Sequence, residues 1–145
     1  MPSSDKSTPF CSWDEGCQVG IQKLDDQHKG LFLTLNKLYD ILMSHGEPAL
    51  VDKELSNLMR QTRTHFETEE KFMLEHGYPG YQMHKVMHEL LLQQLEDVLT
   101  LESNDYEQPW IERLEQADFL HAWLIAHILD EDKKIGAFLK IDGAN

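Results

Sequence analysis

Histidine and carboxylate side chains recur at helical spacing in stretches that are otherwise apolar. His65 and Glu69 are four residues apart, as are His84 and His88, so each pair lies about one turn apart on one helix face. A single buried histidine is usually a hydrogen-bonded core residue, and either pair alone is a weak signal. Several such groups buried together without a cation would leave donors, acceptors and charges unpaired. Their convergence therefore favours a metal site.

Four long segments, which would position these residues, carry apolar side chains at intervals of three and four residues, and none alternates as a strand does. The pattern predicts helices at about 22–44, 48–76, 81–102 and 109–134, with Pro48 and Gly77 bounding the second. Short links favour antiparallel neighbours. The predicted fold is all-α, an antiparallel up-down-up-down four-helix bundle with an N-terminal arm. The predicted inward positions near the histidines are Leu31, Leu35, Leu58, Thr62, Phe66, Leu91, Leu95, Val98, Leu114, Leu120, Leu124 and Ile128.

The histidines fall at helix ends that meet in such a bundle. His28 is near the start of the first helix and His127 near the end of the fourth, while the two pairs flank the turn between the second and third. An acidic residue after His127 completes the set. On a regular helix Glu131 lies nearer to His127, because the five-residue step to Asp132 rotates the side chain by about 140°; a tightened or bulged turn would bring Asp132 inward instead.

The number of candidate ligands points to two metal ions. Seven protein ligands are too many for one ion and suit two ions that are each roughly six-coordinate. If both carboxylates and one solvent oxygen bridge the ions, about eleven of twelve positions are filled. One position then remains for a small diatomic ligand. Imidazole and carboxylate ligands also suit zinc, manganese or cobalt, so the residues alone leave the metal open.

The whole pattern resembles the hemerythrin family, in particular the single-domain bacterial hemerythrins. The similar stretches are Trp13 with 19–21, residues 24–29, 65–70, Tyr78-Pro79 before His84 and His88, and Trp123-Leu124 before His127 with 132–134. The resemblance implies two iron ions joined by an oxo or hydroxo bridge, and it favours Asp132 over Glu131. The implied ligands are His84, His88 and His127 on one iron, His28 and His65 on the other, with Glu69 and Asp132 bridging. It also implies a dry oxygen pocket on the two-histidine iron, formed by Phe66, Leu124 and Ile128 with Trp123 behind them. We expect His45, His76 and His121, which have no place in this pattern, on the surface.

Length and charge limit the remaining possibilities. A chain of 145 residues fits one domain, which we place at residues 13–140 after a flexible leader at 1–12 that lacks the apolar segment of a secretion signal. No apolar run approaches the roughly 20 residues of a membrane span, so a cytoplasmic protein without a membrane partner is expected. The formal charge of -13 argues against nucleic acid as a partner. Cys11 and Cys17 are too few for a zinc-type cysteine set and are interpreted as reduced structural residues.

Three functions are compatible with a histidine-rich two-metal site. Reversible dioxygen binding for storage, transport or delivery is favoured, because oxygen-activating sites use Glu-rich ligand sets. Its partners would be dioxygen and a protein recipient or reductase. An oxygen or redox sensor that acts through a protein partner is the alternative. An enzyme is disfavoured because the HExxH, GxSxG and P-loop motifs are absent from the sequence. The oligomeric state is not predicted.

Overall fold

The computed structural model describes residue 13 and residues 15–99 and 109–141, with only the backbone at 98, 99 and 109–114. A short 3₁₀ turn, η1 (Glu15–Cys17), precedes helix α2 (Gln22–Met43). Helices α3 (Pro48–His76) and α4 (Tyr81–Leu99) follow. The last helix has three parts, α5 (Pro109–Ala126), a π-helical turn η3 (His127–Asp132) and α6 (Lys133–Ile141). Strands are absent from these ranges, which confirms the all-α prediction.

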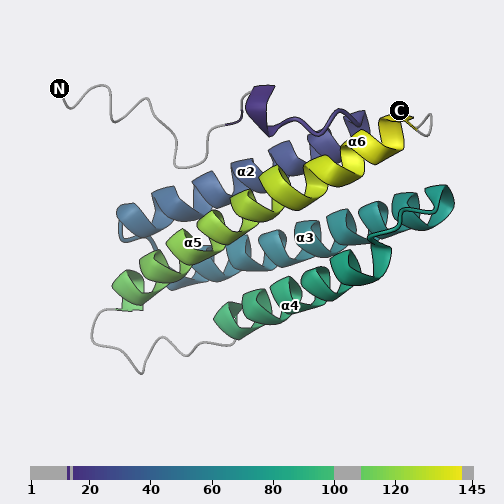
Figure 1. The fold of residues 1–145 in the computed structure, drawn as a ribbon. Helices are drawn as coiled ribbons and strands as arrows, with labels where there is room; N and C mark the ends of the chain where they lie inside the picture. The colour runs from purple at the N-terminus through teal and green to yellow at the C-terminus, as the bar shows by residue number, and fades with distance from the viewer. Residues whose placement is uncertain (1–12, 14, 100–108, 142–145) are drawn as a thin grey trace.

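The helices form an antiparallel four-helix bundle (Figure 1). Helix α2 packs against α3 and α5, while α4 packs mainly against α3. Residues 44–47 connect α2 to α3, and residues 77–80 connect α3 to α4. Such short connections leave consecutive helices antiparallel. The ends of the helices that carry the histidines therefore lie side by side, as the sequence predicted.

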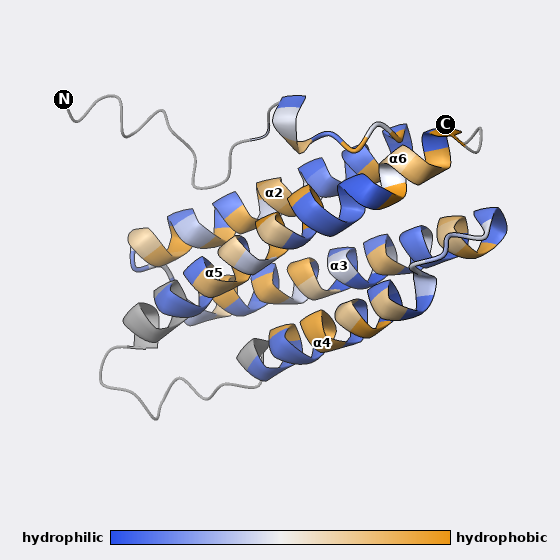
Figure 2. Ribbon diagram, in the orientation of Figure 1, coloured by the Kyte–Doolittle hydropathy of each residue, from blue (hydrophilic) through white to orange (hydrophobic). Residues whose placement is uncertain are grey.

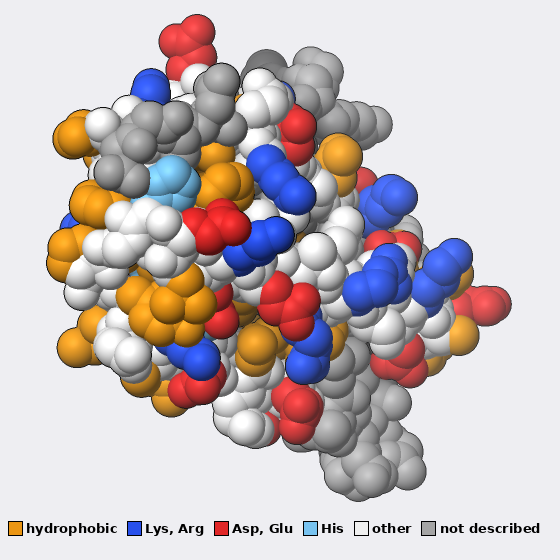
Figure 3. Space-filling model, turned by 90° about the vertical axis from the view of Figure 1, so that its right-hand side faces the viewer, with side chains coloured by type: hydrophobic (Ala, Val, Ile, Leu, Met, Phe, Trp, Pro, Cys, Tyr) orange, Lys and Arg blue, Asp and Glu red, His pale blue; other side chains and the backbone are white. Residues whose placement is uncertain are grey.

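Two apolar clusters fill the core, and a polar layer separates them along the bundle. The first contains Leu35, Leu58 and Leu124, and the second contains Leu24 and Ile135. The buried histidines, Glu69 and Asp132 lie between these clusters. Hydrophilic and hydrophobic residues alternate along each helix, as amphipathic helices require (Figure 2). Seen from the end, acidic and basic side chains are intermixed on the surface (Figure 3). The residues of the polar layer are therefore mostly out of contact with bulk water. Of the predicted inward positions, Val98 and Leu114 lie outside the described side chains.

Helix ends follow the local signals in the sequence. Pro48 occupies the first turn of α3, where its missing N–H would have no helical partner. Gly77 ends α3 in the left-handed conformation at φ 66°, and its N–H donates to the carbonyl of Leu74. The bounds of α3 agree with the prediction. The predicted end of the fourth helix near Lys134 was wrong, because the helix continues to Ile141 and buries Ile135 and Leu139.

The segment before α2 is held against the bundle by hydrogen bonds and close packing. The carboxylate of Asp25 accepts hydrogen bonds from the backbone N–H groups of Val19, at 2.8 Å, and Gly20, at 3.2 Å. Gly136 in α6 faces the Val19 carbonyl so closely that a Cβ atom would lie 2.1 Å from its oxygen. The predicted leader at 1–12, with Cys11, lies outside the described residues, and Cys17 is buried in the core. None of the helices in the described ranges combines the length and apolar composition of a membrane span.

Candidate metal centre

All four long helices of the bundle contribute to one buried polar layer. Its members are 0–7% exposed, and the most exposed of them is His127. They are His28 from α2, His65 and Glu69 from α3, His84 and His88 from α4, and His127 and Asp132 from the π-turn η3. The structure thus brings all seven sequence-predicted residues together, although they span more than 100 positions of the chain.

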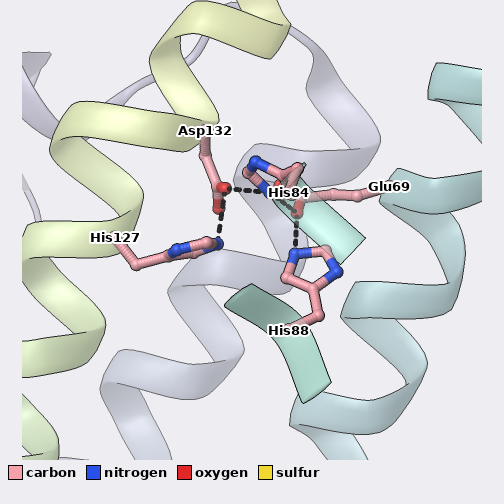
Figure 4. A group of neighbouring side chains, drawn as sticks. All are labelled: Glu69, His84, His88, His127 and Asp132. Carbon is pink, nitrogen blue, oxygen red and sulfur yellow. Dashed lines mark hydrogen bonds and ion pairs between the residues drawn. The ribbon is translucent and has the colours of Figure 1, made fainter. Parts of the chain in front are cut away.

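One group of donors gathers three histidines around the two carboxylates (Figure 4). The Nε2 atom of His88 lies 3.0 Å from Glu69 Oε1, and that of His84 lies 3.3 Å from the same oxygen. On the other side, Asp132 Oδ1 lies 3.1 Å from His127 Nε2 and 3.2 Å from His84 Nε2. One donor atom from each of the five residues lies within 4.8 Å of every other.

A second group contains two histidines and the same two carboxylates. Asp132 Oδ2 lies 2.9 Å from His28 Nε2 and 3.4 Å from His65 Nε2. The remaining oxygen of Glu69, Oε2, lies 3.2 Å from His65 Nε2. Glu69 and Asp132 therefore each turn one oxygen toward each group of histidines. This is the arrangement that two carboxylates bridging a pair of cations require.

The donor atoms are better placed to bind metal ions than to form hydrogen bonds with one another. Three buried, inward-facing atoms, Glu69 Oε2, His127 Nε2 and Asp132 Oδ1, have ion-pair contacts of 3.1–3.2 Å but no well-aligned hydrogen bond. Buried polar atoms are rarely left in this state unless an ion or water completes them. Donors on a six-coordinate ion with bonds of about 2.1 Å are about 3 Å apart, which matches the spacing seen here. Among the described residues, both groups have the composition and spacing of a cation site.

Electrostatics within the layer favours positive charge between the carboxylates. Burial lowers the pKa of His65, but the carboxylates of Glu69 and Asp132 outweigh it and raise this pKa to about 10. The pKa of His84 rises to about 9 in the same way, burial being outweighed by hydrogen bonds to Asp132 and Glu69. Burial and Asp132 raise the pKa of Glu69, yet His65 and His84 bring it down to about 2. Cations at the centre would take the place of the protons that these histidines otherwise hold.

The π-turn explains how Asp132 enters the site. Hydrogen bonds in a π-helix join residues five apart, so a five-residue step returns to the same side of the helix. His127 and Asp132 span the turn and are both buried. Glu131, the residue that regular geometry would place inward, is 30% exposed at its side chain and pairs with Lys134 at 3.3 Å. The sequence left a tightened or a bulged turn open as the way to bring Asp132 inward, and the structure shows the bulged one.

Three residues to which the sequence assigned no role, although they lie in the stretches similar to the family, support the histidines from outside. Gln27 Oε1 lies 2.8 Å from His65 Nδ1, and Glu70 Oε2 lies 2.9 Å from His88 Nδ1. Thr68 accepts a hydrogen bond from Gln27 Nε2 at 3.0 Å. Gln27 is next to His28 in sequence but contacts His65 on another helix, so no local spacing could reveal this contact.

A small apolar cavity adjoins the layer. It has a volume of about 20 Å³, enough for one water-sized guest. The residues around it are Leu35, Leu58, Thr62, Phe66, Leu91, Leu95, Leu120, Trp123 and Leu124. Phe66 joins the cavity to the donors, because its ring also stacks on His88 at 3.7 Å between centroids. Three of the four residues predicted to form the oxygen pocket line this cavity, whereas Ile128 is fully buried but does not. Their place beside the two-histidine group stays a prediction, because the stacking contact is to His88 of the three-histidine group.

The other histidines of the chain lie outside the layer. His45 is exposed after α2, while His76 and His121 are partly exposed. His76 stacks on Phe72, with 6.4 Å between ring centroids. A surface groove of about 350 Å³ between α4 and the last helix reaches His127, with Leu90, Trp123 and Glu131 among its lining residues.

A four-helix bundle with a buried layer of histidines and shared carboxylates defines a class of cation-binding proteins. Residues 19–139 match the family model described as the hemerythrin HHE cation binding domain. The chain therefore belongs to the hemerythrin family.

Individual relatives agree over most of the chain. A hemerythrin of Sipunculus nudus is 33% identical, over 87% of this chain and 90% of its own. The bacteriohemerythrin of Methylococcus capsulatus is 32% identical, over 86% of this chain and 90% of its own. Among solved structures, a wild-type hemerythrin superposes with a TM-score of 0.76 at 27% identity, covering 90% of this chain and 98% of that chain.

Proposed function

We propose that this protein binds dioxygen reversibly at a diiron centre, for oxygen storage, transport or delivery. In this assignment His84, His88 and His127 hold one iron. His28 and His65 hold the other, and the two shared carboxylates bridge them. The observation that carries the proposal is that two groups of donors share Glu69 and Asp132, with one carboxylate oxygen turned toward each group. The family of the chain, whose named relatives are hemerythrins, supports iron as the metal.

The balance of ligands supports binding over substrate oxidation. A pair of ferrous ions supplies the two electrons that reversible dioxygen binding uses. The protein surrounds the pair with five imidazoles and only two carboxylates, whereas oxygen-activating bundle sites carry mostly Glu ligands, whose negative charge stabilises oxidised iron. The neutral histidines therefore favour return to the ferrous state.

The apolar surroundings support reversibility in a second way. Leu124 and Phe66 are 6% and 1% exposed, and both line the cavity beside the histidines. Apart from Thr62 and Trp123 the lining is apolar, so it offers few proton donors to a bound ligand and gives water few hydrogen-bond partners. A small uncharged gas can enter such a space, and the scarcity of proton donors would slow the proton-driven loss of bound dioxygen in its reduced form.

The test is the visible absorption of the ferrous-loaded protein under nitrogen, after admission of air, and after the air is removed. We expect a band that appears with air and disappears on its removal, with two irons per chain. A permanent ferric spectrum would favour the redox-sensing alternative over reversible binding. A protein that takes up no iron would contradict the diiron centre, and His65→Ala, which removes one donor, is the control for iron at this site.

A further inference from the structure

Among the five histidines of the polar layer, His65 and His88 are hydrogen-bonded at their outward ring nitrogens, and their acceptors differ in charge. His65 Nδ1 meets the amide oxygen of Gln27 at 2.8 Å. His88 Nδ1 meets the carboxylate of Glu70 at 2.9 Å. His65 belongs to the two-histidine group and His88 to the three-histidine group, so these two contacts support different groups.

The orientation of the Gln27 amide follows from a chain of hydrogen bonds along α3. The hydroxyl of Thr68 donates to the backbone carbonyl of Thr64 at 2.9 Å, so its oxygen is left as an acceptor. The Gln27 NH₂ group donates to that oxygen at 3.0 Å. The amide oxygen must then face His65, which fixes the proton on His65 Nδ1 and leaves Nε2 free to bind a cation.

Glu70 imposes the same tautomer on His88 but adds a negative charge. A carboxylate can only accept at neutral pH, so His88 Nδ1 carries the proton and Nε2 faces Glu69 at 3.0 Å. The Glu70 side chain is 23% exposed, so the charge acts on His88 from the edge of the core. A carboxylate behind a ligand histidine strengthens it as an electron donor to the metal, whereas a neutral amide does so less.

We propose that Gln27, with Thr68, and Glu70 are positioning residues that make the two halves of the site unequal. Glu70 raises the affinity of the three-histidine half for a cation, so this half binds the first one. Gln27 orients His65 through a neutral contact and keeps the two-histidine half the weaker electron donor. This inference rests on the proposed two-metal site and adds to it a division of charge between the halves.

Calorimetric titration of the metal-free full chain with Zn²⁺ tests the charge division. We expect two binding steps in the wild type. Glu70→Gln, which keeps an acceptor but removes the charge, should weaken the first step about 10–100-fold, the usual effect of changing a residue behind a metal ligand. Gln27→Glu should instead strengthen the second step. Unchanged affinities, or both variants acting on the same step, would overturn the proposal, whereas a wild type that binds no Zn²⁺ would overturn the two-metal site itself.

Imidazole ¹⁵N NMR of the Zn²⁺-loaded protein tests the positioning role of Thr68. Thr68→Val removes the acceptor that holds the Gln27 amide, and Thr68→Ser keeps it. We expect the His65 Nδ1–H signal to exchange faster with solvent or disappear in the valine variant, to persist in the serine variant, and the His88 signal to stay unchanged in both. An unaltered His65 signal in Thr68→Val would show that Gln27 does not depend on Thr68.

Discussion

Glu69 and Asp132 differ from the histidines because each faces both halves of the site. Glu69 Oε1 meets His84 and His88, while its Oε2 meets His65. Replacing Glu69 with alanine should therefore remove most iron from both positions. His28→Ala takes a donor from the two-histidine half only and should leave about one iron per chain. Iron and protein assays of the purified variants measure this difference, and two irons retained in Glu69→Ala would contradict the shared role of the carboxylate.

Leu124 contributes both to core packing and to the proposed oxygen pocket, and a matched control variant distinguishes the two roles. Leu124→Ala should enlarge the cavity, cost about 2–5 kcal/mol of stability and speed autoxidation by admitting water. Leu139→Ala is the matched control, because Leu139 is fully buried in the other apolar cluster. We expect it to lower the free energy of unfolding similarly without changing autoxidation, as followed by denaturant melts and by the rate of spectral change in air. Equal autoxidation rates in both variants would show that Leu124 does not belong to the oxygen pocket.

At the scale of the element, the π-turn decides which acidic side chain reaches the site. It places Asp132 in the core and leaves Glu131 partly exposed beside Lys134. Asp132→Asn should therefore reduce metal affinity by one order of magnitude or more, whereas Glu131→Gln should change it little. Metal titration of the two metal-free variants makes the comparison. A loss in Glu131→Gln equal to that in Asp132→Asn would mean that the turn reverts to α-helical geometry in the metal-bound protein.

The helices were predictable from sequence because their signals are local. Pro48 and Gly77 mark α3, and apolar periodicity marks the buried faces. The length of the last helix was missed, because burial of Leu139 depends on packing against the segment around Val19 rather than on a local stop signal. Spacing and family resemblance selected the seven residues that the structure brings together in the polar layer, and their role as metal ligands stays a prediction. The contact between Gln27 and His65 joins two helices, so it required the structure.

At the scale of the whole molecule, the metal site and the fold depend on each other. Each of the four long helices supplies at least one donor, and the donors form a polar layer between two apolar clusters. When cations are absent, the layer is held by the packing around it and by contacts between its carboxylates and histidines, which are then protonated at His65 and His84. A cation that binds the folded bundle and not the unfolded chain stabilises the fold by mass action.

Metal removal should therefore lower the thermal stability of the whole bundle. At a free metal concentration about 100 times Kd, binding adds about 2.7 kcal/mol, which corresponds to a rise in Tm on the order of 10 °C for a domain of this size. The measurement is thermal unfolding, followed by helical circular dichroism, with a chelator and with increasing ferrous ion under nitrogen. Glu69→Ala provides the control, because metal should no longer shift its Tm. A wild-type Tm that does not depend on metal would mean that the four helices do not bind the cations jointly in the folded state.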